Sequence, residues 1–442
     1  MEITSREELV DALTEAAELE HGLLCQYVFA AVSLKQTADE GITWPQAELV
    51  RGWKRTLLEV ARQEMAHLGT VCNLLTAIGG PPHLGRPNFP QPARYFTDLP
   101  FVLEPFSEPT LRRFMRFEEP VTPETREALI APAPLLYRHV GELYRDIAEG
   151  LAALDDGTLF IGPIADQDDN DWSRGLHLSP VRDLASARAA TDFIVVEGEG
   201  APGHRQGSHY ERFVEAHRAL LRELDADPDF APGRPVAANP LTRAHHDAPA
   251  GGTVIEDPRT LPIAELFAVS YETALMMLGQ FYSFGAETPG QREELRQATR
   301  EMMSGVIRPL AEVLTRLPMG EHLPGQTAGP GFELYGTVQV SPHTENAWFV
   351  ISERLARHGR QGLELAEGSD APPRLRLCAE NLARIGDNLT RAAASGFTTP
   401  SPALARRTLL VTAEPASEGR IRPARTATAR YGTAASAGSP DA

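Results

Sequence analysis

Lysine and cysteine are scarce in this chain of 442 residues. Lys35 and Lys54 are its only lysines, and 60 acidic residues against 42 basic ones leave a formal net charge of −18. A negative surplus disfavours the binding of polyanions, so we expect neither nucleic acid nor an anionic membrane surface as a partner. The three cysteines, Cys25, Cys72 and Cys378, form no CxxC pair and no even-numbered disulfide framework. This usage is typical of a reducing compartment, and we expect a cytoplasmic protein.

Long apolar runs are absent as well. An uninterrupted apolar stretch of about 18 residues, the length that spans a bilayer, does not occur, which argues against a membrane helix. The first residues are acidic and lack the apolar core of a signal peptide. Hydrophobic residues nevertheless make up 42% of the chain, enough to bury a real core. The composition therefore excludes fibrous, disulfide-stapled and wholly disordered chains.

Helical periodicity runs through most of the sequence, and alternating strand patterns are absent. The spacing of apolar residues predicts helices over about 5–35, 43–79, 110–117, 134–154, 181–199, 208–224, 262–284, 289–317, 344–365 and 373–395. We predict an all-α fold in four parts. These are a four-helix bundle with inserted loops over 1–225, a linker over 226–260, a second helical region over 261–400, and a disordered tail rich in small residues over 401–442.

Three chemically active side chains lie on apolar helix stripes. Glu20 is in the middle of the stripe of the first long helix, and Glu64 and His67 are on that of the second. A buried carboxylate is unfavourable by several kcal/mol unless it is paired or bound to metal. The Glu-x-x-His spacing puts a carboxylate and an imidazole on one helix face, as dimetal carboxylate bundles do. A salt bridge is the alternative, but the glutamate on the preceding helix favours a metal site.

A dimetal site needs further ligands, and the later helices offer candidates. Glu142 lies on a polar stripe of the third bundle helix, which leaves a solvent-facing position equally open. Glu197 or Glu199, together with His209 at the start of the next helix, would complete a set of four glutamates and two histidines. Tyr27 lies two turns beyond Glu20 on the same face. It is a candidate redox or proton donor, with core packing as the alternative.

Several short motifs carry a family resemblance. Residues 19–27 (LEHGLLCQY) and 62–68 (RQEMAHL) resemble the first and second metal helices of the ferritin-like family. The motifs GELY, VEGEG, SHYERF and AGPGFE are similar to those of one branch, the ferritin-like part of the iminophenyl-pyruvate dimer synthases of violacein and indolocarbazole pathways; they begin at residues 141, 196, 208 and 328. This resemblance implies a ferritin-like bundle with a set of metal ligands: Glu20, Glu64, His67, Glu142, His209 and Glu199, with Glu197 in place of Glu199 as the alternative.

The resemblance also implies a function. We expect a non-haem diiron oxidase or oxygenase that activates O2 and oxidises a small amino-acid-derived or aromatic substrate in specialised metabolism. Two iron ions are the expected cofactor, with manganese as the alternative metal. A dimanganese catalase-like enzyme, a non-catalytic pathway partner that keeps the fold, and a haem-dependent coupling enzyme are the competing hypotheses. The expected partner is a small-molecule substrate, and homodimerisation is left open.

Overall fold

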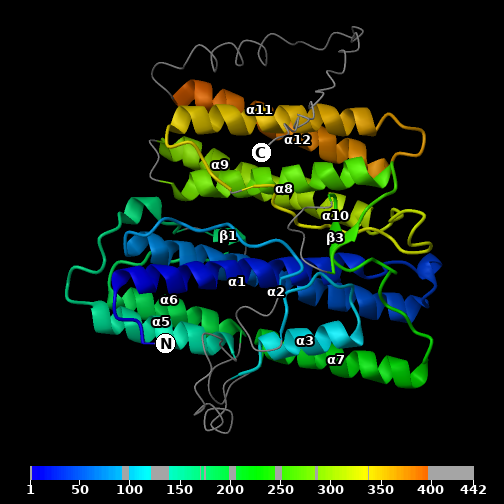
Figure 1. The fold of residues 1–442 in the computed structure, drawn as a ribbon, viewed down its shortest axis with the longest axis horizontal. Helices are drawn as coiled ribbons and strands as arrows, with labels where there is room; N and C mark the ends of the chain where they lie inside the picture. Colours follow the sequence, from blue (N-terminus) through cyan, green and yellow to red (C-terminus); the bar gives the residue numbers. More distant parts are fainter. Residues whose placement is uncertain are drawn as a thin grey trace, which may run out of the picture.

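Helices dominate the part of the chain that the structure describes, as the all-α prediction requires. This computed structural model describes residues 2–91, 99–120, 139–169, 171–173, 176–198, 206–243, 251–283, 287–336 and 338–396. The helices form two stacked layers, with the N-terminal bundle in one and the helices from α8 onward in the other (Figure 1). The predicted tail over 401–442 lies outside the described residues.

A long antiparallel helix pair forms the centre of the N-terminal bundle. Helix α1 (Arg6–Ser33) begins after Ser5, whose side chain accepts a hydrogen bond from a backbone N–H in the first turn. Helix α2 (Trp44–Ala77) begins at a complete capping box made by Thr43 and Gln46. Such caps satisfy backbone donors that a helix start leaves unpaired. The sequence therefore sets both helix starts locally, and packing between the two helices aligns them.

The other half of this bundle consists of four shorter helices in two pairs. Helix α3 (Glu108–Phe117) packs against α7 (His209–Ala226), and α5 (Val140–Leu154) packs against α6 (Leu184–Gly198). The two pairs follow one another along the lower side of α1 and α2 (Figure 1). Positions three and four of the bundle are therefore each split into two helices, and helix ends meet near the middle of α1 and α2.

The C-terminal layer is a second bundle of antiparallel helices. Its members are α8 (Thr260–Tyr282), α9 (Pro289–Met302), α10 (Arg308–Leu314), α11 (Thr344–Leu365) and α12 (Pro373–Gly396). Both α8 and α12 pack against α9 and α11. The sequence predicts one helix over 289–317, whereas the structure inserts a π-helical turn, Met303–Ile307, between α9 and α10. The side chain of Asn381 donates to the carbonyl of Gly305 within this turn, at 3.1 Å.

Strands are minor elements among the described residues. Strands β1 (Asp171–Ser173) and β2 (Leu176–His177) pair antiparallel, and β3 (Pro240–Leu241) pairs in parallel with β4 (Thr253–Val254). Two short 3-10 helices, Ala38–Glu40 and Ile164–Asp166, lie in connections between α-helices. None of these elements interrupts the helical layers.

Helix α8 is apolar because it is a core helix of the second bundle. In the described part of the chain it alone is long and apolar enough to cross a membrane, but 67% of its most apolar window is buried inside the protein. Burial against α9 and α11 accounts for this composition.

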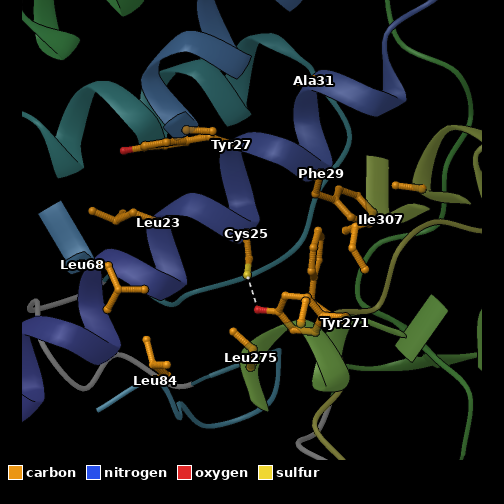
Figure 2. Packing of buried hydrophobic residues seen from close by; sticks show 14 of the residues in the cluster. Leu23, Cys25, Tyr27, Phe29, Ala31, Leu68, Leu84, Tyr271, Leu275 and Ile307 are labelled. Carbon is orange, nitrogen blue, oxygen red and sulfur yellow. Dashed lines mark hydrogen bonds between the residues drawn. The ribbon is translucent and has the colours of Figure 1, made fainter. Parts of the chain in front are cut away.

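One continuous hydrophobic core joins the two layers. Figure 2 shows Cys25 and Phe29 of α1 directed toward Tyr271 of α8 and Ile307, while Tyr27 points the other way, into the N-terminal bundle. The Cys25 Sγ atom lies 3.3 Å from the hydroxyl of Tyr271. Helix α1 therefore has two buried faces, one toward the second bundle and one toward the centre of its own.

Candidate metal centre

The three residues on the long apolar stripes meet inside the N-terminal bundle. The Nδ1 atom of His67 lies 2.9 Å from Glu64 Oε2 and 3.5 Å from Glu20 Oε2. Each of the three residues is 1% exposed. One ligand atom from each lies within 4.8 Å of the others, which is close enough for one metal ion to contact all three.

A second group of potential ligands shares Glu64 with the first. The Nδ1 atom of His209 lies 3.0 Å from Glu64 Oε1 and 3.6 Å from Glu118 Oε1. Ligand atoms of these three buried residues also lie within 4.8 Å of one another. One oxygen of Glu64 therefore faces each histidine. A carboxylate placed in this way can bridge two cations.

Unsatisfied polar atoms indicate that a cation fits here. His209 is fully buried, and although its Nδ1 atom lies 3.0 Å from Glu64 Oε1, neither ring nitrogen makes a well-directed hydrogen bond among the described residues. Glu64 Oε1, which faces the imidazole of His209, is also without one. Each unpaired buried polar group costs about 1–3 kcal/mol. A cation between these two atoms would satisfy both, and carboxylate oxygen with imidazole nitrogen suits iron or manganese.

The charges within the metal-free cluster also indicate that a cation fits there. Burial, together with the charge of Glu64, raises the pKa of Glu20 to about 8. Burial would lower the pKa of His209, but the negative charges of Glu64 and Glu118 outweigh it and raise that pKa to about 9. Burial likewise opposes the charge of Glu64, yet the two histidines hold its pKa well below the usual value. Protons therefore supply the positive charge that these carboxylates need.

Two tyrosines donate hydrogen bonds to the carboxylates of the cluster. The hydroxyl of Tyr144, on α5, donates to Glu20 Oε1 at 2.5 Å, and that of Tyr27 donates to Glu118 Oε1 at 2.5 Å. Burial raises the pKa of both phenols well above the usual value, so both stay protonated. The redox or proton-donor role of Tyr27 stays a prediction. Sequence reasoning missed Tyr144, whose contact with Glu20 joins residues 124 positions apart.

The remaining predicted ligands lie in different places. Glu197 Oε2 is 3.0 Å from His67 Nε2, the nitrogen that faces away from Glu20 and Glu64. Glu142 is only 7% exposed, so its stripe does not face solvent at this residue. Within the described chain, the two groups of ligand atoms include neither Glu142 nor Glu197. Glu199 lies outside the described residues, and the ligand roles of all three stay predictions.

Glu118 is the residue of the cluster that sequence reasoning missed. It directly follows the last residue of α3, where helical periodicity ends. Its carboxylate lies against the end of α6, because a Cβ atom on Gly198 would be 3.0 Å from Glu118 Oε2. A glycine at position 198 therefore leaves room for this carboxylate. The weak signal available in the sequence was the glycine after Glu197, which allows close approach to the backbone.

Helix ends bring the later residues to the site. Glu118 follows α3, Glu142 lies in the first turn of α5, Glu197 in the last turn of α6, and His209 opens α7. The hydroxyl of Ser208 caps α7 and fixes where that helix starts. The breaks in the third and fourth bundle positions thus occur at the level of the cluster.

Comparison with known proteins gives matches to the N-terminal bundle and also to most of the chain. The ferritin-like family model matches residues 13–218. The chain is 30% identical over 402 residues to dichlorochromopyrrolate synthase of Lentzea aerocolonigenes. It is 31% identical over 396 residues to 2-imino-3-(indol-3-yl)propanoate dimerase of Chromobacterium violaceum. These alignments cover 80% and 82% of this chain but 38% and 37% of the relatives, so the chain spans less than two fifths of their length.

A solved ferritin-like protein from Caulobacter vibrioides is also similar, with a TM-score of 0.47 at 19% identity, over 68% of this chain and 96% of that one. The family match includes all five clustered residues, namely Glu20, Glu64, His67, Glu118 and His209. Residues 13–218 of this chain match the ferritin-like family model, in agreement with the resemblance of the sequence motifs.

Proposed function

We propose that this chain is a metal-dependent oxidoreductase that uses O2 to oxidise a small amino-acid-derived or aromatic substrate. The observation that carries the proposal is the sharing of Glu64 between two buried groups of ligand atoms. The similarity to biosynthetic enzymes supports the substrate class, since one relative is named for an imino acid that bears an indole ring. Function does not follow from fold alone, so the cluster and not the bundle carries the argument.

The residues divide into two sets around Glu64. Glu20 and His67 would hold one ion with Glu64, while Glu118 and His209 would hold the other. Iron bound there supplies one-electron redox chemistry and a place for O2 to bind. The chain itself supplies negative charge, orients the carboxylates and excludes water.

The surroundings of the cluster orient the carboxylates and exclude water. The hydroxyls of Tyr144 and Tyr27 each donate to one carboxylate and limit its rotation. The ring of Phe193 packs edge-on against His67, with centroids 5.6 Å apart. The rings of Phe114 and Phe213 cover Tyr27. Apolar, buried surroundings of this kind confine a reactive oxidant and protect it from side reactions.

Metal reconstitution tests the proposal directly. The chain, loaded with Fe(II) without oxygen, should bind two iron ions and then consume O2 in the presence of indole-bearing imino acids. Glu64→Ala should abolish metal binding and turnover, and His67→Ala should reduce both. The matched control is Glu215→Ala on the exposed face of α7, which should change neither. Full product formation by Glu64→Ala and His67→Ala would refute the proposal in favour of a non-catalytic partner.

The competing hypotheses predict other results. Bound manganese with rapid release of O2 from peroxide would identify a catalase-like enzyme and refute the oxidase. A Soret band in the absorption spectrum of the active protein would identify a haem enzyme. Iron-dependent O2 uptake without either result supports the oxidase.

A further inference from the structure

His67 presents its two ring nitrogens to different surroundings. Its Nδ1 atom faces Glu64 and Glu20, at 2.9 and 3.5 Å. Its Nε2 atom faces Glu197 Oε2, at 3.0 Å. A neutral imidazole binds a metal through one nitrogen and carries its proton on the other. Since the carboxylates of the metal group lie on the Nδ1 side, Nδ1 would be the ligand atom, and an Nε2–H group would donate to Glu197.

Glu197 is itself held in place by neighbouring helices. Its Oε1 atom accepts a hydrogen bond from Gln63 Nε2 at 2.9 Å. The Gln63 Oε1 atom accepts in turn from Arg212 Nη1 at 3.2 Å. Gln63 precedes Glu64 on α2, Glu197 lies in the last turn of α6, and Arg212 lies on α7. A chain of hydrogen bonds across three helices therefore fixes the outer side of the His67 ring.

The two histidines of the cluster differ in this respect. His67 has a carboxylate acceptor on its outer nitrogen, whereas His209 Nε2 has no hydrogen-bond partner among the described residues. A carboxylate that accepts the outer N–H of a ligating histidine fixes the ring and makes it a stronger donor. The metal group that contains His67 is therefore better prepared to bind an ion than the group that contains His209.

We infer that Glu197 is a positioning residue that accepts the Nε2 proton of His67, aims Nδ1 at the metal, and makes Glu20, Glu64 and His67 the tighter of two metal sites. The inference rests on the proposed two-metal function. It gives Glu197 a role other than the ligand role that its motif suggests. The side chain is 22% exposed, as expected for a group that faces the outside of the cluster.

Metal titration of variants tests this role. Without oxygen, Fe(II) should bind wild-type protein in two steps of different affinity. Glu197→Ala should weaken the tighter step by about 10–100-fold, and Glu197→Gln, which keeps an oxygen acceptor, should weaken it less. Both variants should still bind two ions. The matched control is Glu59→Gln, which removes a carboxylate near Arg62 and Arg212, at 3.9 and 3.6 Å, and should leave both steps within about twofold.

A second readout reports on the ring of His67 itself. In Zn(II)-loaded protein, nitrogen NMR should show the proton of His67 on Nε2 and the metal on Nδ1. Glu197→Ala should broaden or shift the Nε2–H signal through exchange with solvent, which a general loss of stability would not do. The Glu59→Gln control should retain the wild-type signal.

The outcomes separate this inference from the proposed function. If Glu197→Ala binds one ion instead of two, Glu197 is a ligand and the inference is wrong. If the variant matches wild type in both affinity and NMR signal, the inference is also wrong while the two-metal function stands. If wild-type protein binds no metal at all, both the proposed function and the inference are wrong.

Discussion

Metal binding to this cluster should release protons, because the metal-free cluster stores them. Glu20 has a pKa of about 8 and His209 one of about 9. Burial opposes the charge on His67, but Glu64 and the hydrogen bonds to Glu197 and Glu20 outweigh it and raise the pKa of His67 well above its usual value. Each of the three groups therefore holds a proton at pH 7. A metal ligand must give its proton up.

The pH dependence of the metal affinity follows from the number of protons that metal binding displaces. Loading both sites at pH 7 should release about three protons, one each from Glu20, His67 and His209. The affinity per ion should then rise about 30-fold per pH unit, which corresponds to about 2 kcal/mol. The rise should become less steep as the pH passes through about 8 for Glu20 and about 9 for His209, since those two protons are then already lost.

The stability of the metal-free protein should change in the opposite direction. Glu20 and His209 have folded pKa values above their ordinary values of 4.5 and 6.5. Each group therefore contributes stability that is complete below its ordinary pKa and is lost as the pH rises through about 8 for Glu20 and about 9 for His209. The difference in Tm between metal-loaded and metal-free protein should widen from pH 6 to pH 9.

Calorimetry can measure the protons directly. Titration with a divalent metal at pH 7, in two buffers of different ionisation enthalpy, gives the number of protons released. Thermal unfolding with and without metal at pH 6, 7.5 and 9 checks the trend in stability. The exposed variant Glu215→Gln is the control and should release as many protons as wild type. Metal binding without proton release, or a Tm difference that narrows as the pH rises, would refute this account of the cluster.

Three further predictions concern single side chains. Glu118→Gln should lower the metal content from two ions to one, because it removes a carboxylate of the group around His209; metal analysis that still finds two ions would contradict the assignment. Tyr144→Phe and Tyr27→Phe should each lower the free energy of unfolding by about 1–3 kcal/mol, since each leaves a buried carboxylate oxygen without its donor. Urea denaturation measures this, and unchanged midpoints would show that the hydroxyls are dispensable. Gly162→Ala should destabilise the fold by at least about 1 kcal/mol, because its Cβ would lie 1.7 Å from the carbonyl oxygen of Thr76; an unchanged Tm would count against this packing.

Local signals predicted the helices and the family. Ser5, Thr43 and Gln46 form caps whose geometry depends on a few neighbouring residues, so the starts of α1 and α2 could be read directly. The π-helical turn at Met303–Ile307 could not be read in this way, and its hydrogen bond with Asn381 joins residues that are far apart in the sequence. The all-α, ferritin-like fold could be predicted because periodicity and motif order both depend on short stretches of chain. The family match confirms this prediction.

The candidate site was predictable where it lies on long helices. Glu20, Glu64 and His67 interrupt apolar stripes, and a polar residue on such a stripe has to face the interior. Glu118 and Tyr144 gave no comparable signal. Glu118 follows a helix end, and its partner Tyr27 is 91 positions away in the sequence. Only the folded arrangement shows that the carboxylate comes from the end of α3.

The splitting of the bundle helices gives a separate electrostatic reason to expect a cation. A helix has a partial negative charge at its C-terminus, which disfavours a carboxylate there by about 0.3–1 kcal/mol. Glu118 follows the end of α3, Glu197 lies in the last turn of α6, and the Gly198 contact brings these two ends together. The last turn of α3 contains Arg116, whereas no basic residue occupies the last turn of α6. Two acids at two converging negative helix ends are unfavourable unless positive charge lies between them. Without metal, protonated His67 lies against Glu197 and protonated His209 lies near Glu118, and divalent cations held by these histidines would add further positive charge close to both acids.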